Sequence, residues 1–526
     1  MANLSTILDG HPDGAAALVS RGQVTTYGEL VEQVGRLRGG LVGLGVRPGE
    51  RVALLAANNW YFVVSYLAAL GTGAAIVPLN PTSPTAELHG ELAAVRARLA
   101  IASPSAVAAL SGVDRAAVGL EQVVVGAAEG ASVDGAVTLE SVMAGSPAPA
   151  VERADGDIAV MIFTAGTAGA PKPAMLSHGA LLANLEQVQR HPGRTVRADD
   201  VVLGVLPMFH IFGLNVMLDL ALLAGASVVL VERFEPDAAL ETIAARGVTV
   251  VGGSPTMFAA LAAVPGATGA ELRSVRLAVS GAAALTDEVA DSFTARFGIP
   301  LWQGYGLTEA GPVVTSSVVG GEGAGGEGAG GEGAGGEGAG GEGGGGDVRR
   351  SSIGVPIPGV DVRLVDEEGE DALEGDPGEI WVKGPNLFSG YWNDPEATDR
   401  ALTADGWLRT GDMAVADDDG YLYIVDRVKD VIIVSGFNVY PAEVEEVLLA
   451  HPGIAEVAVA GRPHPYSGET VVAFVVPERG AAIEEDDVIA WAGSRLARYK
   501  CPTKVTFVES LPQGVAGKVL RRALPG

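Results

Sequence analysis

Short apolar runs, many of them rich in β-branched residues, recur along the chain and alternate with segments of helical spacing such as Pro236–Ala245. A strand that is apolar along its whole length is buried on both faces, which is typical of parallel sheets covered by helices. We therefore predict an α/β fold with mostly parallel sheets. The runs predicted to be strands are Val52–Ala56, Ile158–Phe163, Val201–Leu206, Ser227–Val231, Val248–Gly252 and Val275–Ser280.

Two features divide the chain. Residues 320–346 consist of four GGEGA repeats followed by further Gly and Glu, and we expect a flexible, solvated loop there because this composition cannot bury apolar surface. The pattern also changes after Tyr423, where a short charged segment, Asp426–Asp430, precedes a new series of strands and helices. We predict a hinge at this segment, between a large N-terminal αβαβα-type domain (1–426) and a small C-terminal α+β domain (427–526).

Composition restricts the function. Lys and Arg number 35 against 64 Asp and Glu, a net charge of −29, which disfavours a nucleic-acid or anionic-membrane surface. The single cysteine, Cys501, excludes an intramolecular disulfide framework, and we expect a cytoplasmic protein, monomeric or dimeric. Residues 201–218 lack formal charge over a membrane-spanning length, but Pro207, His210 and Asn215 favour a buried strand, loop and helix.

The most specific segment, Phe163–Pro173, is rich in Gly and Thr and contains one lysine. We name it the phosphate loop, because glycines allow backbone N–H groups to approach a phosphate while Thr hydroxyls and an ammonium bind it. It is not a Walker loop, since Pro173 follows Lys172. A plain surface turn is the alternative. The expected ligands of the phosphates are Thr164, Gly166, Thr167, Gly169 and Lys172.

Four more motifs follow: Gln303–Glu309 (QGYGLTE), Gly406–Asp412 (GWLRTGD), Asp426–Asp430 (DRVKD) and Pro512–Arg522 (PQGVAGKVLRR). Each is weak alone. Together, and in this order, the five motifs resemble those of the acyl-adenylating superfamily, which includes acyl-CoA synthetases, adenylation domains of peptide synthetases and firefly-type luciferases. The resemblance covers nearly the whole chain.

The resemblance implies a two-step reaction with ATP, Mg²⁺ and coenzyme A. A carboxylate attacks the α-phosphate of ATP to give acyl-AMP and pyrophosphate, and a thiol then displaces AMP. Charge on the phosphoryl oxygens requires a metal and fixed cations. By resemblance, Glu309 and Thr167 hold Mg²⁺, Thr308 donates to the α-phosphate, and Lys518 joins the carboxylate to the α-phosphate. Only six lysines occur in the chain, and Lys172, Lys429 and Lys518 all fall within motifs.

The resemblance also assigns the remaining positions. Gly281, Ala282 and Ala283, which follow a predicted strand, are expected to line the adenine pocket together with Gly304, Tyr305 and Gly306. Asp412 and Arg427 are expected at the ribose, Lys429 at the hinge and Gly436 beside the tunnel for the CoA thiol. His210 matches a position near the acyl pocket and the thiol path, where we expect a gate. The alternative for His210 is a buried histidine satisfied by the backbone.

The phosphate loop departs from the family pattern at three positions. Ala165 and Ala168 replace residues that usually carry hydroxyl groups, and Pro173 replaces a glycine, which removes an N–H donor. We expect ATP to bind, with weaker phosphate contacts. The 320–346 repeat lies close in sequence to the acyl site, and we expect a tolerated surface expansion rather than a lid.

The segments expected to form the acyl pocket contain no Arg or Lys, which disfavours a dicarboxylate, and no Asp near His210 to bind an amino acid's ammonium. We expect an apolar monocarboxylate: a fatty acid first, an aryl acid second, with Trp302 able to shorten the pocket. Few residues follow Lys518, so we expect the acyl acceptor to be free CoA rather than a carrier domain fused to this chain. The alternatives are a separate carrier protein as acceptor and an inactive nucleotide-binding paralogue. The pocket segments are His210–Leu214, Gly252–Met257, Val279–Ala284, Trp302–Gly306 and Ala310–Val314.

Overall fold

The computed structural model describes most of the chain. The described residues are 3–126, 133–165, 171–192, 196–318, 349, 351–366, 368–373, 375–427, 432–478, 481–512, 521, 524 and 525. The predictions for Gly166, Thr167, Gly169, Lys429, Lys518 and the 320–346 repeat therefore lie outside the described residues, and so does the side chain of Arg427.

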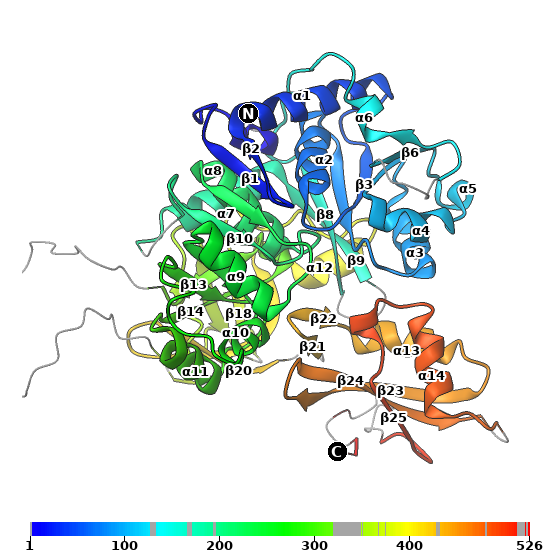
Figure 1. Ribbon diagram of the computed structural model, residues 1–526. Coiled ribbons are helices and arrows are strands. Elements are labelled where there is room, and N and C mark those ends of the chain that lie inside the picture. The colour runs from blue at the N-terminus through cyan, green and yellow to red at the C-terminus, as the bar shows by residue number, and fades with distance from the viewer. Residues whose placement is uncertain are drawn as a thin grey trace, which may run out of the picture.

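Two large sheets form the N-terminal part (Figure 1). Both are mostly parallel, with antiparallel strands only at their edges. The seven-stranded sheet has the order β7 (Val137–Thr138), β6 (Gln122–Val125), β5 (Leu99–Ala102), β3 (Arg51–Leu55), β4 (Ala75–Leu79), β8 (Ile158–Ala165) and β9 (Pro171–Ser177). The nine-stranded sheet has the order β16 (Val355–Pro356), β15 (Val313–Ser316), β14 (Leu301–Gly306), β13 (Leu277–Ser280), β12 (Val250–Gly253), β10 (Val201–Gly204), β11 (Ser227–Leu230), β1 (Ala16–Ser20) and β2 (Gln23–Thr26).

Helices cover both faces of each sheet. Alternate residues of β3 show this, because Val52 and Leu54 join the central core between the sheets while Ala53 and Leu55 join an outer core. The central layer holds α1 (Tyr27–Gly43), α2 (Trp60–Gly71), α7 (His178–Gln189) and α8 (Leu220–Ala224). The outer layers hold α3 (Thr85–Val95), α4 (Val107–Ser111) and α5 (Arg115–Val118) on one side, and α9 (Pro236–Arg246), α10 (Pro255–Ala262) and α11 (Asp287–Phe297) on the other. Short α6 (Leu139–Val142) contacts α1.

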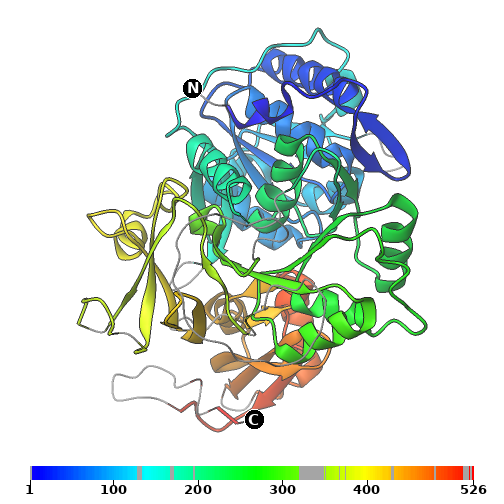
Figure 2. The same ribbon diagram turned by 90° about the vertical axis from the view of Figure 1, so that its left-hand side faces the viewer.

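Two smaller sheets complete the molecule, and Figure 2 separates the yellow one from the orange C-terminal domain. The first contains β17 (Asp361–Val365), β18 (Gly378–Lys383), β19 (Leu408–Ala416) and β20 (Leu422–Arg427), with α12 (Pro395–Ala401) beside β19. The second contains β22 (Phe437–Val439), β21 (Ile432–Val434), β24 (Gly468–Pro477), β23 (Ile454–His464) and β25 (Lys504–Phe507), covered by α13 (Pro441–Leu449) and α14 (Glu485–Gly493). The hinge that we predict would lie between β20 and β21.

The structure confirms the predicted fold class, a large domain of mostly parallel sheets with a small α+β domain after it. Each run predicted as a strand contains one, although β12 and β13 begin two residues later than predicted. Within 201–218, β10 is followed by the π-helix η3 (Phe212–Asp219). Among the described residues, no helix is both long enough and apolar enough to cross a membrane.

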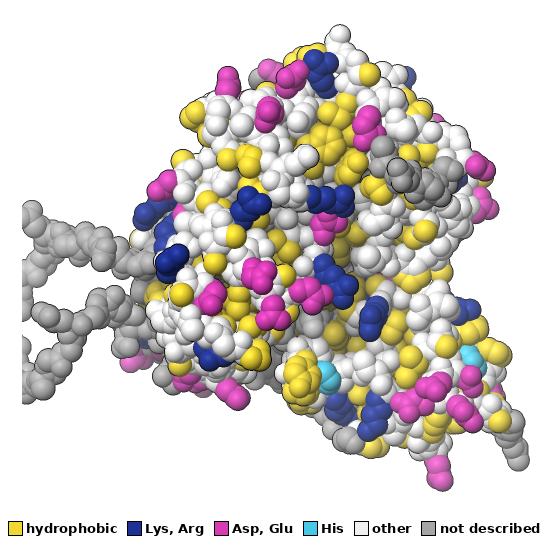
Figure 3. Space-filling view, viewed as in Figure 1, with side chains coloured by type: hydrophobic (Ala, Val, Ile, Leu, Met, Phe, Trp, Pro, Cys, Tyr) yellow, Lys and Arg dark blue, Asp and Glu magenta, His cyan; other side chains and the backbone are white. Residues whose placement is uncertain are grey.

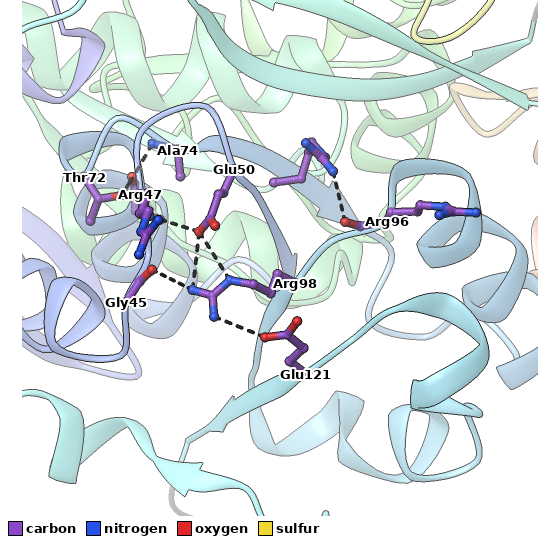
Figure 4. A network of polar contacts seen from close by, with 10 residues as sticks. Gly45, Arg47, Glu50, Thr72, Ala74, Arg96, Arg98 and Glu121 are labelled. Carbon is purple, nitrogen blue, oxygen red and sulfur yellow. Dashed lines mark hydrogen bonds and ion pairs between the residues drawn. The ribbon is translucent and has the colours of Figure 1, made fainter.

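A polar network joins the turn between α1 and β3 to the start of β5 (Figure 4). The guanidinium of Arg98, which directly precedes β5, donates to Glu50 and to the Gly45 carbonyl, and it pairs with Glu121 at 3.4 Å. Glu50 also accepts from the backbone N–H of Arg47 at 3.0 Å. These bonds fix the turn between α1 and β3, so this network supports the fold and contributes nothing to the site described next.

Candidate active site

One cavity of about 310 Å³ opens between the nine-stranded sheet, helices α7 and η3, the four-stranded sheet and the C-terminal domain. The loops that follow the carboxyl ends of parallel strands β13 and β14 line it, as is usual for α/β sheets, and β12 contributes residues of the strand itself. Most sequence-predicted residues in the described ranges line it. They are Thr164, His210, Gly281, Ala282, Gly304, Tyr305, Gly306, Thr308, Glu309, Asp412 and Gly436.

Glu309 is buried in the short 3₁₀ helix η4 (Thr308–Ala310), directly after β14. Its Oε1 accepts hydrogen bonds from the Thr164 hydroxyl at 3.1 Å and from the Tyr391 hydroxyl at 2.7 Å. Burial, then the neighbouring Glu309 charge, raises the pKa of Tyr391 well above its usual range, so this hydroxyl stays a donor. Two neutral donors hold the carboxylate without neutralising it, which suits a ligand of a divalent cation. Sequence reasoning missed Tyr391.

Asp412 lies on β19 and faces the same cavity. Its Oδ2 accepts from the Tyr305 hydroxyl at 2.8 Å, and its backbone N–H donates to the Thr410 hydroxyl at 3.1 Å. The Thr410 hydroxyl in turn donates to the Ile380 carbonyl on β18. The carboxylate is thus positioned by two neighbouring strands and by β14, and it is an acceptor suited to ribose hydroxyls.

The phosphate loop spans the ends of two antiparallel strands, β8 and β9, and the second of these precedes helix α7. β8 and β9 pair with Thr164 opposite Lys172, and helix α7 begins only at His178. The Lys172 ammonium pairs with Asp394 at 2.5 Å and does not line the cavity described here. The sequence suggested a lysine free to bind phosphates, and the structure shows one already held by a carboxylate, which is a difference that sequence spacing could not reveal.

The glycines of the nucleotide side allow close packing. A Cβ on Gly306 would lie 2.0 Å from the Pro312 carbonyl oxygen, and one on Gly281 would lie 2.9 Å from the Phe212 ring. Ala282 adopts a left-handed conformation with φ +67° beside Gly281. Ala283, predicted at the adenine pocket, is not among the residues that line the cavity.

The opposite end of the cavity is aliphatic. Met217, from η3, fills the space beside Gly252, where a Cβ would lie 2.4 Å from its sulfur. Trp302, predicted to shorten the pocket, is buried in the central core and is not among the residues that line the cavity. Sequence reasoning missed most of this wall. The missed residues are Val188, His191, Val196, Val202, Val216, Met217, Leu220, Val250, Val251, Leu277, Thr315, Ser316, Val318 and Ile357.

His210 also lines the cavity. Burial, and then the nearby Lys500 charge, lowers its pKa to about 4, so the imidazole is neutral at ordinary pH. No described residue bonds to its buried Nε2. The ring of Phe437, from the C-terminal domain, packs edge-on against His210 with centroids 5.3 Å apart. The gate that we predicted at His210 stays a prediction, and the structure adds that the ring is neutral and that its Nε2 has no partner among the described residues.

The C-terminal domain supplies the remaining wall. Gly436, Asn438 and Tyr440 line the cavity, and Gly436 has φ +85°. A Cβ there would lie 2.8 Å from Ser254 Cβ on the large domain, so the close approach needs glycine. Near the end of the chain, Leu511 and Leu524 pack together with β23 and β24, and Figure 1 places the C-terminus on the side of this domain remote from the large domain.

These features define a class of site, in which carboxylates and hydroxyls at one end, a closely packed glycine wall and an aliphatic end share one cavity. The AMP-binding enzyme family matches residues 5–392, and the AMP-binding enzyme C-terminal domain matches 443–518. A feruloyl-CoA synthase from Amycolatopsis is 37% identical over 510 residues, covering 96% of this chain and 94% of that protein. A long-chain-fatty-acid–CoA ligase from Bacillus subtilis is 34% identical over 533 residues, covering 96% and 90%.

Among solved structures, the amide bond synthetase McbA from Marinactinospora thermotolerans superposes with a TM-score of 0.83 at 31% identity, covering 99% of this chain and 98% of that one. The chain belongs to the AMP-binding enzyme family and is an AMP-forming acyl-CoA ligase. The resemblance inferred from the five motifs is therefore confirmed. ATP and CoA are co-substrates in this family.

Proposed function

We propose that this enzyme activates an apolar monocarboxylic acid with ATP and transfers the acyl group to CoA. The observation that carries the proposal is the continuity of one cavity from Glu309 and Asp412, past His210, to the aliphatic wall around Met217. The reacting carboxyl would lie at the junction near His210, with its apolar tail directed toward Met217.

In the first step, a carboxylate oxygen of the acid attacks the α-phosphorus, and the bond to pyrophosphate breaks. Glu309 and Thr167 are the residues that would hold Mg²⁺, which supplies charge stabilisation for the phosphoryl oxygens. Thr308 would donate to the α-phosphate, Asp412 would orient the ribose, and Lys518 would bring the two reacting groups together. Among the described residues, no cluster of three His, Cys, Asp or Glu offers a metal site.

In the second step, the CoA thiol loses its proton, and its sulfur attacks the acyl carbon while AMP leaves. The domain orientation supports this step, because Gly436 and Tyr440 line the cavity while Leu524 packs on the C-terminal domain itself. His210, with a pKa of about 4, would shape the thiol path as a neutral ring rather than carry a proton. Figure 3 shows Lys and Arg side chains on both sides of the domain boundary, which suits the anionic CoA despite the net charge of −29.

A fatty acid and an aryl acid both satisfy this cavity. The valine, leucine and methionine lining favours an alkyl tail and provides no cation for a second carboxylate. An aryl acid is supported by two observations: the feruloyl-CoA synthase relative, and Ser280, whose fully buried hydroxyl lines the cavity and finds no partner among the described residues. That hydroxyl could bond a ring substituent that a plain alkyl tail lacks.

The first experiment measures pyrophosphate and AMP release from ATP and Mg²⁺ with a panel of fatty and hydroxycinnamic acids, with and without CoA. Turnover that requires CoA and yields acyl-CoA supports the ligase, and the panel identifies the acid. Accumulation of acyl-AMP that CoA does not consume would indicate another acceptor, either a carrier protein or, as the likeness to an amide bond synthetase suggests, an amine. ATP binding without pyrophosphate release from any acid would favour an inactive nucleotide-binding protein.

Lys518→Ala tests the division of labour between the two steps. Because Lys518 is assigned to the first step alone, the variant is expected to abolish acyl-AMP formation and to leave thioester formation from supplied acyl-AMP largely intact. Lys504→Ala, at an exposed position on β25, is the matched control. Equal loss of both half-reactions in Lys518→Ala would refute the assignment.

A further inference from the structure

A buried group of charges joins the two domains beside the active site. Lys500, in the 3₁₀ helix η5 (Arg498–Lys500) of the C-terminal domain, pairs with Glu87 of the large domain at 2.5 Å and with Glu443 of its own domain at 2.7 Å. The three side chains are 7%, 7% and 8% exposed. Glu87 also accepts the backbone N–H of Ala497 at 2.7 Å. We name Glu87, Lys500 and Glu443 the boundary triad.

Glu91 adds a third carboxylate on the same face of α3, one turn after Glu87. Its Oε2 is buried and has no hydrogen-bond partner among the described residues. Burial is the largest influence and raises the pKa of Glu91 to about 8, with Glu87 and Glu443 raising it further and Lys500 opposing them. The Lys500 ammonium therefore faces two carboxylates that pair with it and the Glu91 carboxyl, which favours its neutral form. Because these groups come from both domains, their charges balance only when the domains are docked.

The boundary triad is continuous with the wall of the active site. Tyr499, next to Lys500, stacks on Phe437 with ring centroids 4.5 Å apart, and Phe437 packs against His210. Gly436, adjacent to Phe437, lies against Ser254. Any movement of Lys500 away from Glu87 would therefore move the stacked rings and the Gly436 wall together, while Glu309 and Asp412 would keep their partners within the large domain.

Resting on the proposed function, we propose that Glu87 and Lys500 are positioning residues for the thioester step. Their ion pair holds the C-terminal domain in the orientation that places Gly436 and Phe437 at the cavity. Membership of this family implies that the C-terminal domain rotates about the hinge between the two half-reactions, and the pair would break when the domain turns for acyl-AMP formation. Glu443 stays with Lys500 throughout, because both belong to the C-terminal domain, and it keeps the ammonium from being left unpaired when the domains separate.

Glu87→Gln is the decisive variant, because it removes the charge across the boundary and leaves the Lys500–Glu443 pair of the C-terminal domain intact. Thioester formation from supplied acyl-AMP is expected to slow about tenfold, since the docked population falls. Acyl-AMP formation, measured by pyrophosphate exchange, is expected to change less than about twofold. Glu87→Asp, which retains the charge, is expected to recover part of the thioester rate. Glu288→Gln, an exposed glutamate in the first turn of α11, controls for helix and charge effects.

Three outcomes separate the possibilities. Loss of the thioester step alone, at an unchanged unfolding temperature, supports the proposal. Equal slowing of both half-reactions, or no slowing of either, overturns the positioning role. A wild-type enzyme that forms acyl-AMP but never a CoA thioester would instead overturn the proposed function. Lys500→Met serves as a second variant, in which the same selective loss is expected if the folded fraction, checked by circular dichroism, is retained.

Discussion

The two walls of the active site are held in different ways. On the large domain, Glu309 and Asp412 accept hydrogen bonds from hydroxyl groups of the same domain, and these bonds do not cross the domain boundary. On the C-terminal domain, Gly436 lines the cavity through the docking of the two domains, and the buried Glu87–Lys500 ion pair joins them among the described residues. We call the wall on the large domain the fixed wall, and it suits a step that requires constant geometry. We call the wall on the C-terminal domain the docked wall, and it suits a step that occurs only when the two domains are docked.

The largest expected effect lies in the fixed wall. Glu309→Gln retains the size of the side chain but removes the charge, and acyl-AMP formation is expected to fall by about 10²–10³-fold because the carboxylate that we propose as a Mg²⁺ ligand is lost. Pyrophosphate release under saturating ATP and acid measures this, with the exposed Glu370→Gln as control. Thioester formation from supplied acyl-AMP is expected to be nearly unchanged. A comparable loss in that second assay would show that the fixed wall serves both steps.

A smaller effect is expected at the aliphatic end of the same wall. Met217→Ala removes the side chain that fills the space beside Gly252, which deepens the cavity. The ratio of kcat/KM for a longer over a shorter acid is expected to rise by about tenfold, since a few methylene groups in an apolar pocket provide that much discrimination. Leu261→Ala, in an outer core, controls for general loss of packing. An unchanged ratio would remove Met217 from the acid site.

The same contrast explains what could be predicted from the sequence. Glu309, Asp412 and Tyr305 were predicted because each belongs to a short contiguous motif whose residues stay together in the fold. Met217 was missed because the aliphatic wall is assembled from single residues of several elements, and no local pattern separates them from core residues. The Lys172–Asp394 pair joins positions that lie far apart in the sequence, and so it could not be read from spacing.

The fold class was predicted, because the same apolar pattern recurs in each of the six buried strands named from the sequence, whereas the contacts between the two domains were not predicted. Glu87 and Lys500 are separated by more than four hundred residues. Each resembles an ordinary surface charge in its own segment, and only docking buries them. Functional residues that lie together in one loop can therefore be predicted from a single sequence. Functional residues that meet only when two domains dock can be identified only from the structure.

The smallest expected effect is a pH dependence of the thioester step, which tests the docking of the C-terminal domain. The pKa of Glu91 is raised to about 8 in the docked orientation, whereas an undocked Glu91 would have its ordinary pKa of about 4.5. At any pH between these two values, Glu91 therefore takes up a proton when the domains dock. Docking is therefore most favourable at low pH and weakens as pH rises toward 8, where the carboxylate would face Glu87 and Glu443 with Lys500 as the nearby cation. Glu91→Gln removes this penalty.

The ratio of the Glu91→Gln rate to the wild-type rate in the thioester step is expected to rise several-fold between pH 6 and pH 8. Taking a ratio cancels the ionisation of the CoA thiol, which affects both enzymes equally. The same ratio for acyl-AMP formation is expected to stay flat, because that step does not use the docked wall. If the ratio of the two rates does not change with pH in either step, Glu91 keeps its ordinary ionisation at the boundary. If the ratio rises with pH in both steps, Glu91 affects the fixed wall rather than docking.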